Sequence, residues 1–190
     1  MRTLFIDFDG TICADRFWRN SPEYIKIQQS LFTENSQVAA DWMRGTYTSE
    51  QINQLVSEQT GILYQILWDT FESDCKTMSV PVDILDLVVA LRNNFYVVLI
   101  TGNMDSFSRF TSPALQLELY FDEIVNSYDE RQLKTDNGGE TFLKYCQGDI
   151  SNAILVEDSQ KSIEVFRSLG GVGHQTDSLE KTLEILHTLK

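Results

Sequence analysis

Two aspartates, Asp7 and Asp9, stand at the end of the first apolar run of the chain, residues 4–11 (LFIDFDGT). A run this apolar is typical of a strand buried on both faces, where a carboxylate without a partner is costly. Gly10 indicates a sharp turn out of the sheet, and on a continuing strand the two carboxylates would share one face. Paired carboxylates can act as nucleophile, as general acid and base, or as metal ligands.

Polar residues follow three later apolar runs in the same way. They are Thr101 with Gly102 after residues 96–100, Lys134 in the loop after residues 123–127, and Glu157 with Asp158 after residues 153–156. The carboxyl ends of parallel strands lie along one edge of a sheet, so these groups can converge there although they are far apart in the sequence. Lys144 is a competitor of Lys134, but it falls within an expected helix, and Lys134 is therefore favoured.

In this order, the four clusters resemble the motifs of the haloacid dehalogenase (HAD) superfamily, whose members mostly transfer phosphoryl groups. Residues 7–11 (DFDGT) are similar to its first motif, and residues 157–171 are most similar to its β-phosphoglucomutase-like branch. The resemblance covers the expected core and not the inserted segment. Thr135 departs from the family, which usually has a proline after the lysine.

The resemblance implies a role for each residue. Asp7 would be the nucleophile that forms an aspartyl-phosphate, and Asp9 the general acid that later serves as the base. Mg²⁺ would be held by Asp7, the backbone carbonyl of Asp9, Glu157 and Asp158, and the phosphate by Thr101, Gly102 and Lys134. An acid two residues after the nucleophile also matters for the subclass, because dehalogenases and phosphonatases of this superfamily lack it.

Electrostatics explains why such residues are needed together. Two like charges about 4 Å apart repel by about 4 kcal/mol even at an effective dielectric constant of 20, and a phosphate dianion is repelled more. Asp7 therefore needs cations beside it before it can attack a phosphate ester. In a chain of net charge -13, a phosphate ester can bind only where a metal or a local cation reverses the sign of the field.

The elements that must position these residues alternate between buried strands and helices. This alternation predicts an α/β fold, a three-layer Rossmann-like parallel sheet of HAD-like type, formed by residues 1–13 and 81–190. Residues 14–80 instead show helical periodicity and are expected to form an inserted helical cap. Within it, Thr48 and Gln51 predict a capping box, and the apolar positions 62, 63, 66, 67 and 71 predict one buried helix face.

Composition limits the partners. The chain has 190 residues, enough for one well-cored domain and an insert, and its 28 acidic against 15 basic residues disfavour nucleic acid and anionic membranes. Three scattered cysteines without a CxxC pair favour a reducing compartment, and no signal-like or membrane-spanning apolar stretch is found. We expect a cytoplasmic protein that is a monomer or a weak homodimer.

These patterns favour a Mg²⁺-dependent phosphatase that acts on a small phosphorylated metabolite. A phosphomutase would use the same residues, and a non-catalytic protein that binds a phosphate or a metal is a further alternative. Arg16 and Arg19, near two aromatic residues, could meet a second anionic group of the substrate, although solvated arginines are the simpler interpretation.

Overall fold

The computed structural model describes all residues from 1 to 190 and contains one five-stranded sheet. The strands are β1 (Arg2–Ile6), β2 (Phe95–Thr101), β3 (Glu123–Asn126), β4 (Ile154–Glu157) and β5 (Val172–Gln175). Their order in the sheet is β3-β2-β1-β4-β5, and every neighbouring pair is parallel. The predicted parallel α/β sheet is thereby confirmed, with β1 at its centre.

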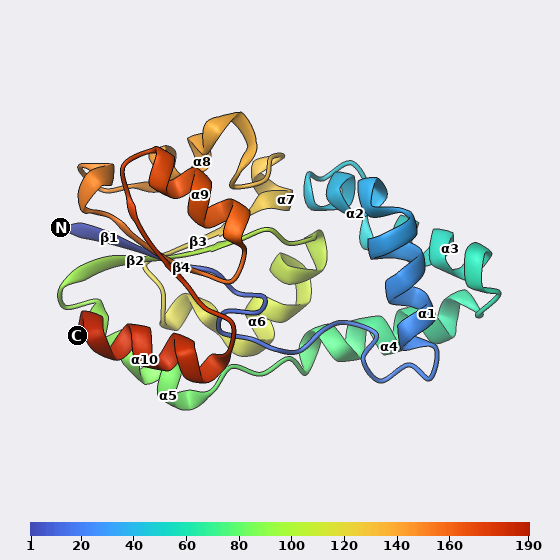
Figure 1. Cartoon of the computed structure of the whole chain (residues 1–190). Helices are drawn as coiled ribbons and strands as arrows, with labels where there is room; N and C mark the ends of the chain where they lie inside the picture. Colours follow the sequence, from blue (N-terminus) through green and yellow to red (C-terminus); the bar gives the residue numbers. More distant parts are fainter.

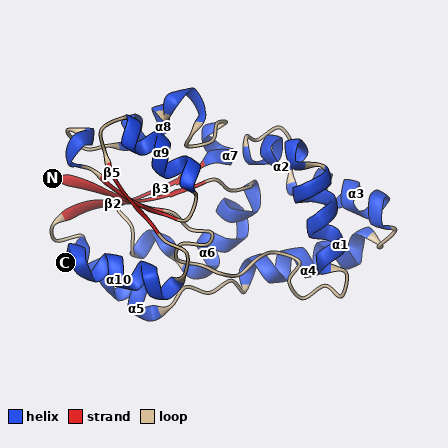
Figure 2. Ribbon diagram, viewed as in Figure 1, coloured by secondary structure: helices blue, strands red, loops and turns tan.

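Helices cover both faces of this sheet (Figures 1 and 2). Helices α8 (Glu140–Tyr145) and α9 (Gln160–Ser168) lie on one face, and α5 (Val82–Leu91) and α10 (Leu179–Leu189) lie on the other. Successive side chains of a strand point to opposite faces. Accordingly, Phe5 of β1 packs with the α8 and α9 side, whereas Leu4 and Ile6 belong to the hydrophobic cluster on the α5 and α10 side.

The stretch between β1 and α5 contains helices and no strand. It comprises α1 (Tyr24–Gln28), the π-helix η1 (Gln29–Glu34), α2 (Ser36–Met43), α3 (Ser49–Thr60) and α4 (Tyr64–Lys76). These helices lie beyond one end of the sheet (Figure 1). The capping box at the start of α3 is confirmed, since Thr48 accepts a hydrogen bond from the Gln51 N–H and the Gln51 side chain accepts one from the Thr48 N–H. The boundaries 14–80 of the cap stay a prediction.

The buried apolar face of α4 is narrower than the sequence predicted. Leu67 and Phe71 of α4 are buried, but Ile66 is 56% exposed and Leu63 is 70% exposed. The expectation for these two residues was wrong because Leu63 precedes the helix, at its N-cap, and Ile66 points about 100° away from Leu67 around the helix axis. Helix α4 therefore buries a narrow face.

No helix of the structure combines the length and the apolar character that crossing a bilayer requires.

The cap packs against the core through one continuous hydrophobic cluster, and a buried carboxylate fastens it there. Asp105, which follows β2, is 4% exposed and accepts hydrogen bonds from two cap residues, the Trp42 indole (2.8 Å) and the Ser49 hydroxyl (2.7 Å). Asp105 also pairs with Arg109 (2.7 Å), which in turn pairs with Glu50 of the cap (2.6 Å). The junction thus combines apolar burial with a charged network whose members are all partnered.

A second junction lies between the end of α2 and the core loops that follow β3. The Arg44 guanidinium donates to both oxygens of Asp136, at 2.7 and 2.9 Å. The pairing raises the pKa of Arg44 and lowers that of Asp136. The Ser127 hydroxyl donates to the Met43 carbonyl (2.8 Å), and Arg131 donates to the Gly45 carbonyl. Cap and core are thus joined on two sides of the space between them.

We expect Asp105→Ala to reduce the free energy of unfolding by about 2 to 4 kcal/mol. The substitution leaves the Trp42 N–H and the Ser49 hydroxyl without their buried acceptor, and it removes one of the two carboxylates that pair with Arg109. Urea denaturation followed by circular dichroism would measure this change. Asp86→Ala is the matched control, since Asp86 is an exposed helical aspartate and its loss should change the value by less than about 0.5 kcal/mol. Equal stabilities of the two variants would contradict the assigned role of Asp105.

Candidate active site

The sheet brings the polar strand ends together at one edge, as the sequence predicted. Asp7 follows β1 directly, Thr101 ends β2 and Glu157 ends β4, while Lys134 reaches the same place from the loop after α7 (Ser127–Glu130). The backbone N–H of Asp7 still bonds to Val156 of β4 (3.0 Å), so the nucleophile candidate is held by the sheet itself. The chain turns away after this point.

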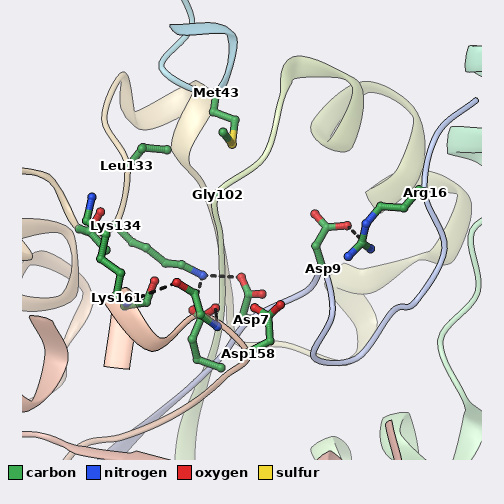
Figure 3. A pocket seen from close by; sticks show the side chains of 13 residues that line it. Asp7, Asp9, Arg16, Met43, Gly102, Leu133, Lys134, Asp158 and Lys161 are labelled. Atoms are coloured by element: carbon green, nitrogen blue, oxygen red, sulfur yellow. Dashed lines mark hydrogen bonds and ion pairs between the residues drawn. The ribbon is translucent and has the colours of Figure 1, made fainter. Parts of the chain in front are cut away.

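Lys134 lies between two buried carboxylates. Its Nζ is 2.5 Å from Asp7 Oδ1, a contact that Figure 3 shows. The same Nζ is 2.5 Å from Glu157 Oε2 and 3.3 Å from the Ile100 carbonyl. Burial by itself would lower the pKa of Lys134, but the charges of Asp7 and Glu157 outweigh it and raise that pKa. Lys134 is therefore a permanent cation. Lys144, in contrast, pairs with Glu130 on the surface (2.6 Å), so the structure brings Lys134 and not Lys144 to Asp7.

Three carboxylates gather beside this lysine. Asp7, Glu157 and Asp158 each offer an oxygen, and these oxygens lie within 4.8 Å of one another. Gly10 makes this possible, because its φ of +78° suits glycine and a Cβ at this position would collide with the Asp158 carboxylate. An all-oxygen set of this kind suits Mg²⁺.

Lys134 alone supplies less positive charge than the three carboxylates of the acidic cluster require. Burial, and then the nearby charge of Asp7, raise the pKa of Glu157 to about 8, and burial raises the pKa of Asp7 although Lys134 opposes the change. One ammonium group therefore does not neutralise the carboxylates around it. A divalent cation held by Asp7, Glu157 and Asp158 would do so, and the three side chains fit such an ion in chemical type and spacing.

The Asp9 carboxylate lies outside the cluster of Asp7, Glu157 and Asp158 and is held from two directions, while the role of the Asp9 backbone carbonyl as a metal ligand stays a prediction. Its Oδ2 accepts a hydrogen bond from Asn103 Nδ2 (2.6 Å), and its Oδ1 is 3.4 Å from Arg16 Nη1. Burial raises the pKa of Asp9 to about 7, against the lowering effect of Arg16. A carboxyl group that titrates near neutrality can both donate and accept a proton during one catalytic cycle.

Thr101 and Gly102 complete the polar edge. Thr101 is 1% exposed, and its Oγ1 is buried with no hydrogen-bond partner in the protein. A buried hydroxyl without a partner costs free energy, so a ligand oxygen would be favourable beside it, although Thr101 itself does not line the cavity described next. Gly102, Asp7, Asp9, Lys134, Glu157 and Asp158 line one cavity of about 330 Å³.

The two arginines differ in placement. Arg16 lines the cavity beside Asp9. Arg19 lies outside it, with its guanidinium bonded to the carbonyls of Asp74 (2.8 Å) and Thr77 (2.9 Å) and 3.6 Å from Asp15. Arg19 therefore ties together the two segments that connect cap and core, and this geometry gives it no contact with a substrate in the cavity.

Three residues of the site were not foreseen. Asn103 is buried and orients Asp9, Met43 brings the cap to the cavity, and Lys161 of α9 contributes an exposed ammonium group to its rim. Figure 3 shows Lys161 on the Lys134 side of Asp7 and Arg16 on the Asp9 side. The position of Asn103, directly after the Thr101–Gly102 strand end, was a usable signal, whereas nothing in the sequence near Met43 indicated contact with the core.

The fold of this chain is that of known HAD-family enzymes. A HAD-family enzyme from Bacteroides thetaiotaomicron, solved with magnesium and inorganic phosphate, superposes with a TM-score of 0.75 at 19% identity over 94% of this chain and 95% of the other. A protein from Porphyromonas gingivalis described as a predicted HAD-like family hydrolase gives 0.73 at 15% identity, covering 100% and 97%. The L-2-haloacid dehalogenase of Xanthobacter autotrophicus, with chloropropionic acid covalently bound, gives 0.66 at 12%, covering 93% and 77%.

No family model matches the sequence, and no curated protein matches it either. At these identities the structural likeness establishes the fold, and the resemblance that the motifs indicated is confirmed at that level. The β-phosphoglucomutase-like branch stays a prediction.

We expect Mg²⁺ to bind at the acidic cluster, and Asp158→Asn to weaken its binding by at least about tenfold because one of three anionic ligands is lost. Isothermal titration calorimetry with MgCl₂ would measure the affinity without reference to any activity. Asp83→Asn is the matched control, because Asp83 is an exposed aspartate of α5 that does not belong to the acidic cluster. This variant should bind Mg²⁺ as the unaltered protein does. Indistinguishable affinities for the two variants would show that the ion binds elsewhere.

Proposed function

We propose that this protein is a Mg²⁺-dependent phosphatase that hydrolyses a small phosphate monoester through an aspartyl-phosphate on Asp7. The observation that carries the proposal is the contact of Asp7 with a buried lysine, 2.5 Å away, next to two further carboxylates that can share a divalent ion with it. The magnesium and phosphate complex of the B. thetaiotaomicron relative supports the same chemistry.

Positive charge is the first requirement of this reaction. Lys134 stays protonated and lies against Asp7, so it can accompany the incoming phosphoryl group. When bound, Mg²⁺ would supply the charge stabilisation and orientation that one ammonium group cannot give. The unpartnered Thr101 hydroxyl and the backbone N–H of Gly102 would hold the remaining phosphate oxygens.

In the first step, an Asp7 carboxylate oxygen forms a bond to phosphorus while the bond from phosphorus to the ester oxygen breaks. Asp9, in its protonated form, gives its proton to the departing oxygen, so an alcohol leaves in place of an alkoxide. Its pKa near 7 leaves a substantial protonated fraction at neutral pH. Asn103 holds one oxygen of Asp9 and leaves the other on the side of Arg16.

In the second step, Asp9 acts as the base. It takes a proton from a water molecule whose oxygen attacks phosphorus, and the bond from phosphorus to Asp7 breaks. Inorganic phosphate and the free Asp7 carboxylate result, and Asp9 is again protonated. The same residue thus serves both steps, and each half-reaction has a lower barrier than direct hydrolysis.

Dehalogenation is the second candidate, because L-2-haloacid dehalogenases share the fold. A halide leaves as an anion and needs neither a proton nor a metal ion. This chain nevertheless holds Asp9 with two partners and keeps three carboxylates together beside Lys134. Both features serve a phosphoryl reaction and have no use in halide displacement. A phosphomutase would keep the phosphoryl group on the substrate, and measurement of inorganic phosphate separates that outcome from hydrolysis.

We expect Asp7→Asn to lower Mg²⁺-dependent phosphate release by at least about 10³-fold, because an amide cannot replace the attacking carboxylate. A screen of phosphorylated metabolites with a colorimetric phosphate assay would measure the loss. Asp86→Asn is the control and should retain full activity. Release of chloride from 2-chloropropionate, with no phosphate release from any ester, would instead support the dehalogenase.

We expect the effect of Asp9→Asn to depend on the leaving group. The kcat/KM for an alkyl phosphate should fall by about 10² to 10⁴, because an alkoxide must be protonated as it leaves. The kcat/KM for 4-nitrophenyl phosphate should fall far less, since nitrophenolate is a stable anion. Steady-state kinetics with both esters would test this, and an equal loss with the two would remove Asp9 from the role of general acid.

A further inference from the structure

A second cavity of about 320 Å³ adjoins the catalytic one on the side of the cap. The two cavities share Asp9, Arg16, Met43 and Gly102 as lining residues. They are therefore neighbouring compartments of one site. Apart from the shared Asp9 and Arg16, the charged groups line only the catalytic compartment, and we call the second one the cap chamber.

The position of Asp9 relates the two compartments to the parts of a substrate. Asp9 lies on their shared wall, and in the proposed reaction it protonates the ester oxygen, which joins phosphorus to the alcohol. The phosphate side of that oxygen belongs with Asp7 and Lys134. The alcohol must then extend to the other side of Asp9, into the cap chamber. This step rests on the proposed function.

The walls of the cap chamber are mainly apolar. They include the rings of Phe17 and Phe32, whose centroids are 6.0 Å apart at 43°, and the thioethers of Met43 and Met104. Phe17 and Met104 are themselves buried. Such walls favour a flat apolar group, because rings and thioethers pack well against an aromatic face. Only Asp9, Arg16 and Gln28 among the lining residues carry polar side chains, so a sugar with several hydroxyl groups would lose more water contacts than these walls replace.

One polar group of the cap chamber is unsatisfied. Gln28 ends α1, where the chain passes into the π-helix η1 that carries Phe32, and its Nε2 is buried with no hydrogen-bond partner. π-helical turns are frequent at functional sites. A buried N–H without an acceptor costs free energy, so an acceptor atom on the bound alcohol would be stabilised here.

We propose that the substrate is the phosphate monoester of a flat, mainly apolar alcohol that carries a hydrogen-bond acceptor, and not a sugar phosphate. The ring of the alcohol packs against Phe17, Phe32 and the two methionines, and its acceptor receives the Gln28 N–H. The phosphate lies on the far side of Asp9. The cap chamber thereby selects the alcohol, while the catalytic compartment acts on any phosphate ester that reaches it.

The test compares esters with similar leaving oxygens. Benzyl phosphate and glucose 6-phosphate are both esters of primary alcohols, and we expect kcat/KM for benzyl phosphate to be at least about tenfold higher because its ring is buried. The best of the three pyridylmethyl phosphates should exceed benzyl phosphate by a further factor of about three to ten, since its nitrogen accepts from Gln28. Purified full-length protein with Mg²⁺ and a phosphate assay is sufficient.

Two variants locate the effect. Phe32→Asn should lower kcat/KM for benzyl phosphate by about ten times more than it lowers kcat/KM for acetyl phosphate, which has no ring. Ile66→Asn is the matched control, because it makes the same kind of change at an exposed cap position, and it should alter neither substrate. In Gln28→Leu, kcat/KM for the best pyridylmethyl ester should fall to about the value that the same variant gives for benzyl phosphate.

The failure of this inference differs from the failure of the proposed function. If acetyl phosphate is hydrolysed but glucose 6-phosphate is turned over as well as benzyl phosphate, the assignment of the cap chamber is overturned and the phosphatase stands. The same holds if Phe32→Asn lowers all substrates equally or if the pyridyl advantage survives in Gln28→Leu. If neither acetyl phosphate, which is a mixed anhydride, nor any of the esters releases phosphate, the proposed function itself fails.

Discussion

The contact between Lys134 and the carboxylates of Asp7 and Glu157 is the constraint on which the site depends. All three residues are at least nine-tenths buried, and removing one partner of such a group leaves an unpaired charge that costs about 3 to 5 kcal/mol. The core must therefore hold β1, β4 and the loop after α7 in one arrangement. Parallel pairing fixes the two carboxylates, because the ends of β1 and β4 are neighbours in register. The lysine arrives on a loop, and Arg44 of the cap holds that loop through Asp136.

The cap therefore helps to position a charged residue of the site, in addition to covering the site. Asp136, the partner of Arg44, lies two residues from Lys134 in sequence, and the Asp105 network binds Trp42 of the same cap helix and Ser49 to the core. With both junctions formed, Met43 reaches the wall shared by the two cavities. The loop that carries Lys134 and the helix that carries Met43 are thus held by one set of contacts.

The strands of the core and the polar residues at their ends could be predicted from short patterns in the sequence. Strands buried on both faces read as apolar runs, and their carboxyl ends must share an edge, so Asp7, Thr101 and Glu157 were placed correctly at that edge. The cap was harder. Ile66 and Leu67 are equally apolar, and only the packing partners of α4 decide that one is exposed and the other buried. Arg19 was misjudged for the same reason, since its partners at Asp74 and Thr77 are about 55 residues away.

The division between strand ends and cap also explains how the fold is shared at 12% to 19% identity while no family model matches the sequence. The proposed chemistry requires a few polar residues at four strand ends, and the strands, which are buried on both faces, require only short runs of apolar residues. Both conditions allow extensive substitution elsewhere. In the proposed reaction the cap faces a different constraint, because its lining would have to fit the alcohol and nothing in the phosphoryl transfer step would limit that choice. Residues such as Phe32 and Gln28 are therefore free to differ between enzymes that keep the same polar strand ends. The walls of the cap chamber, and not the strand ends, would then determine which alcohol is accepted.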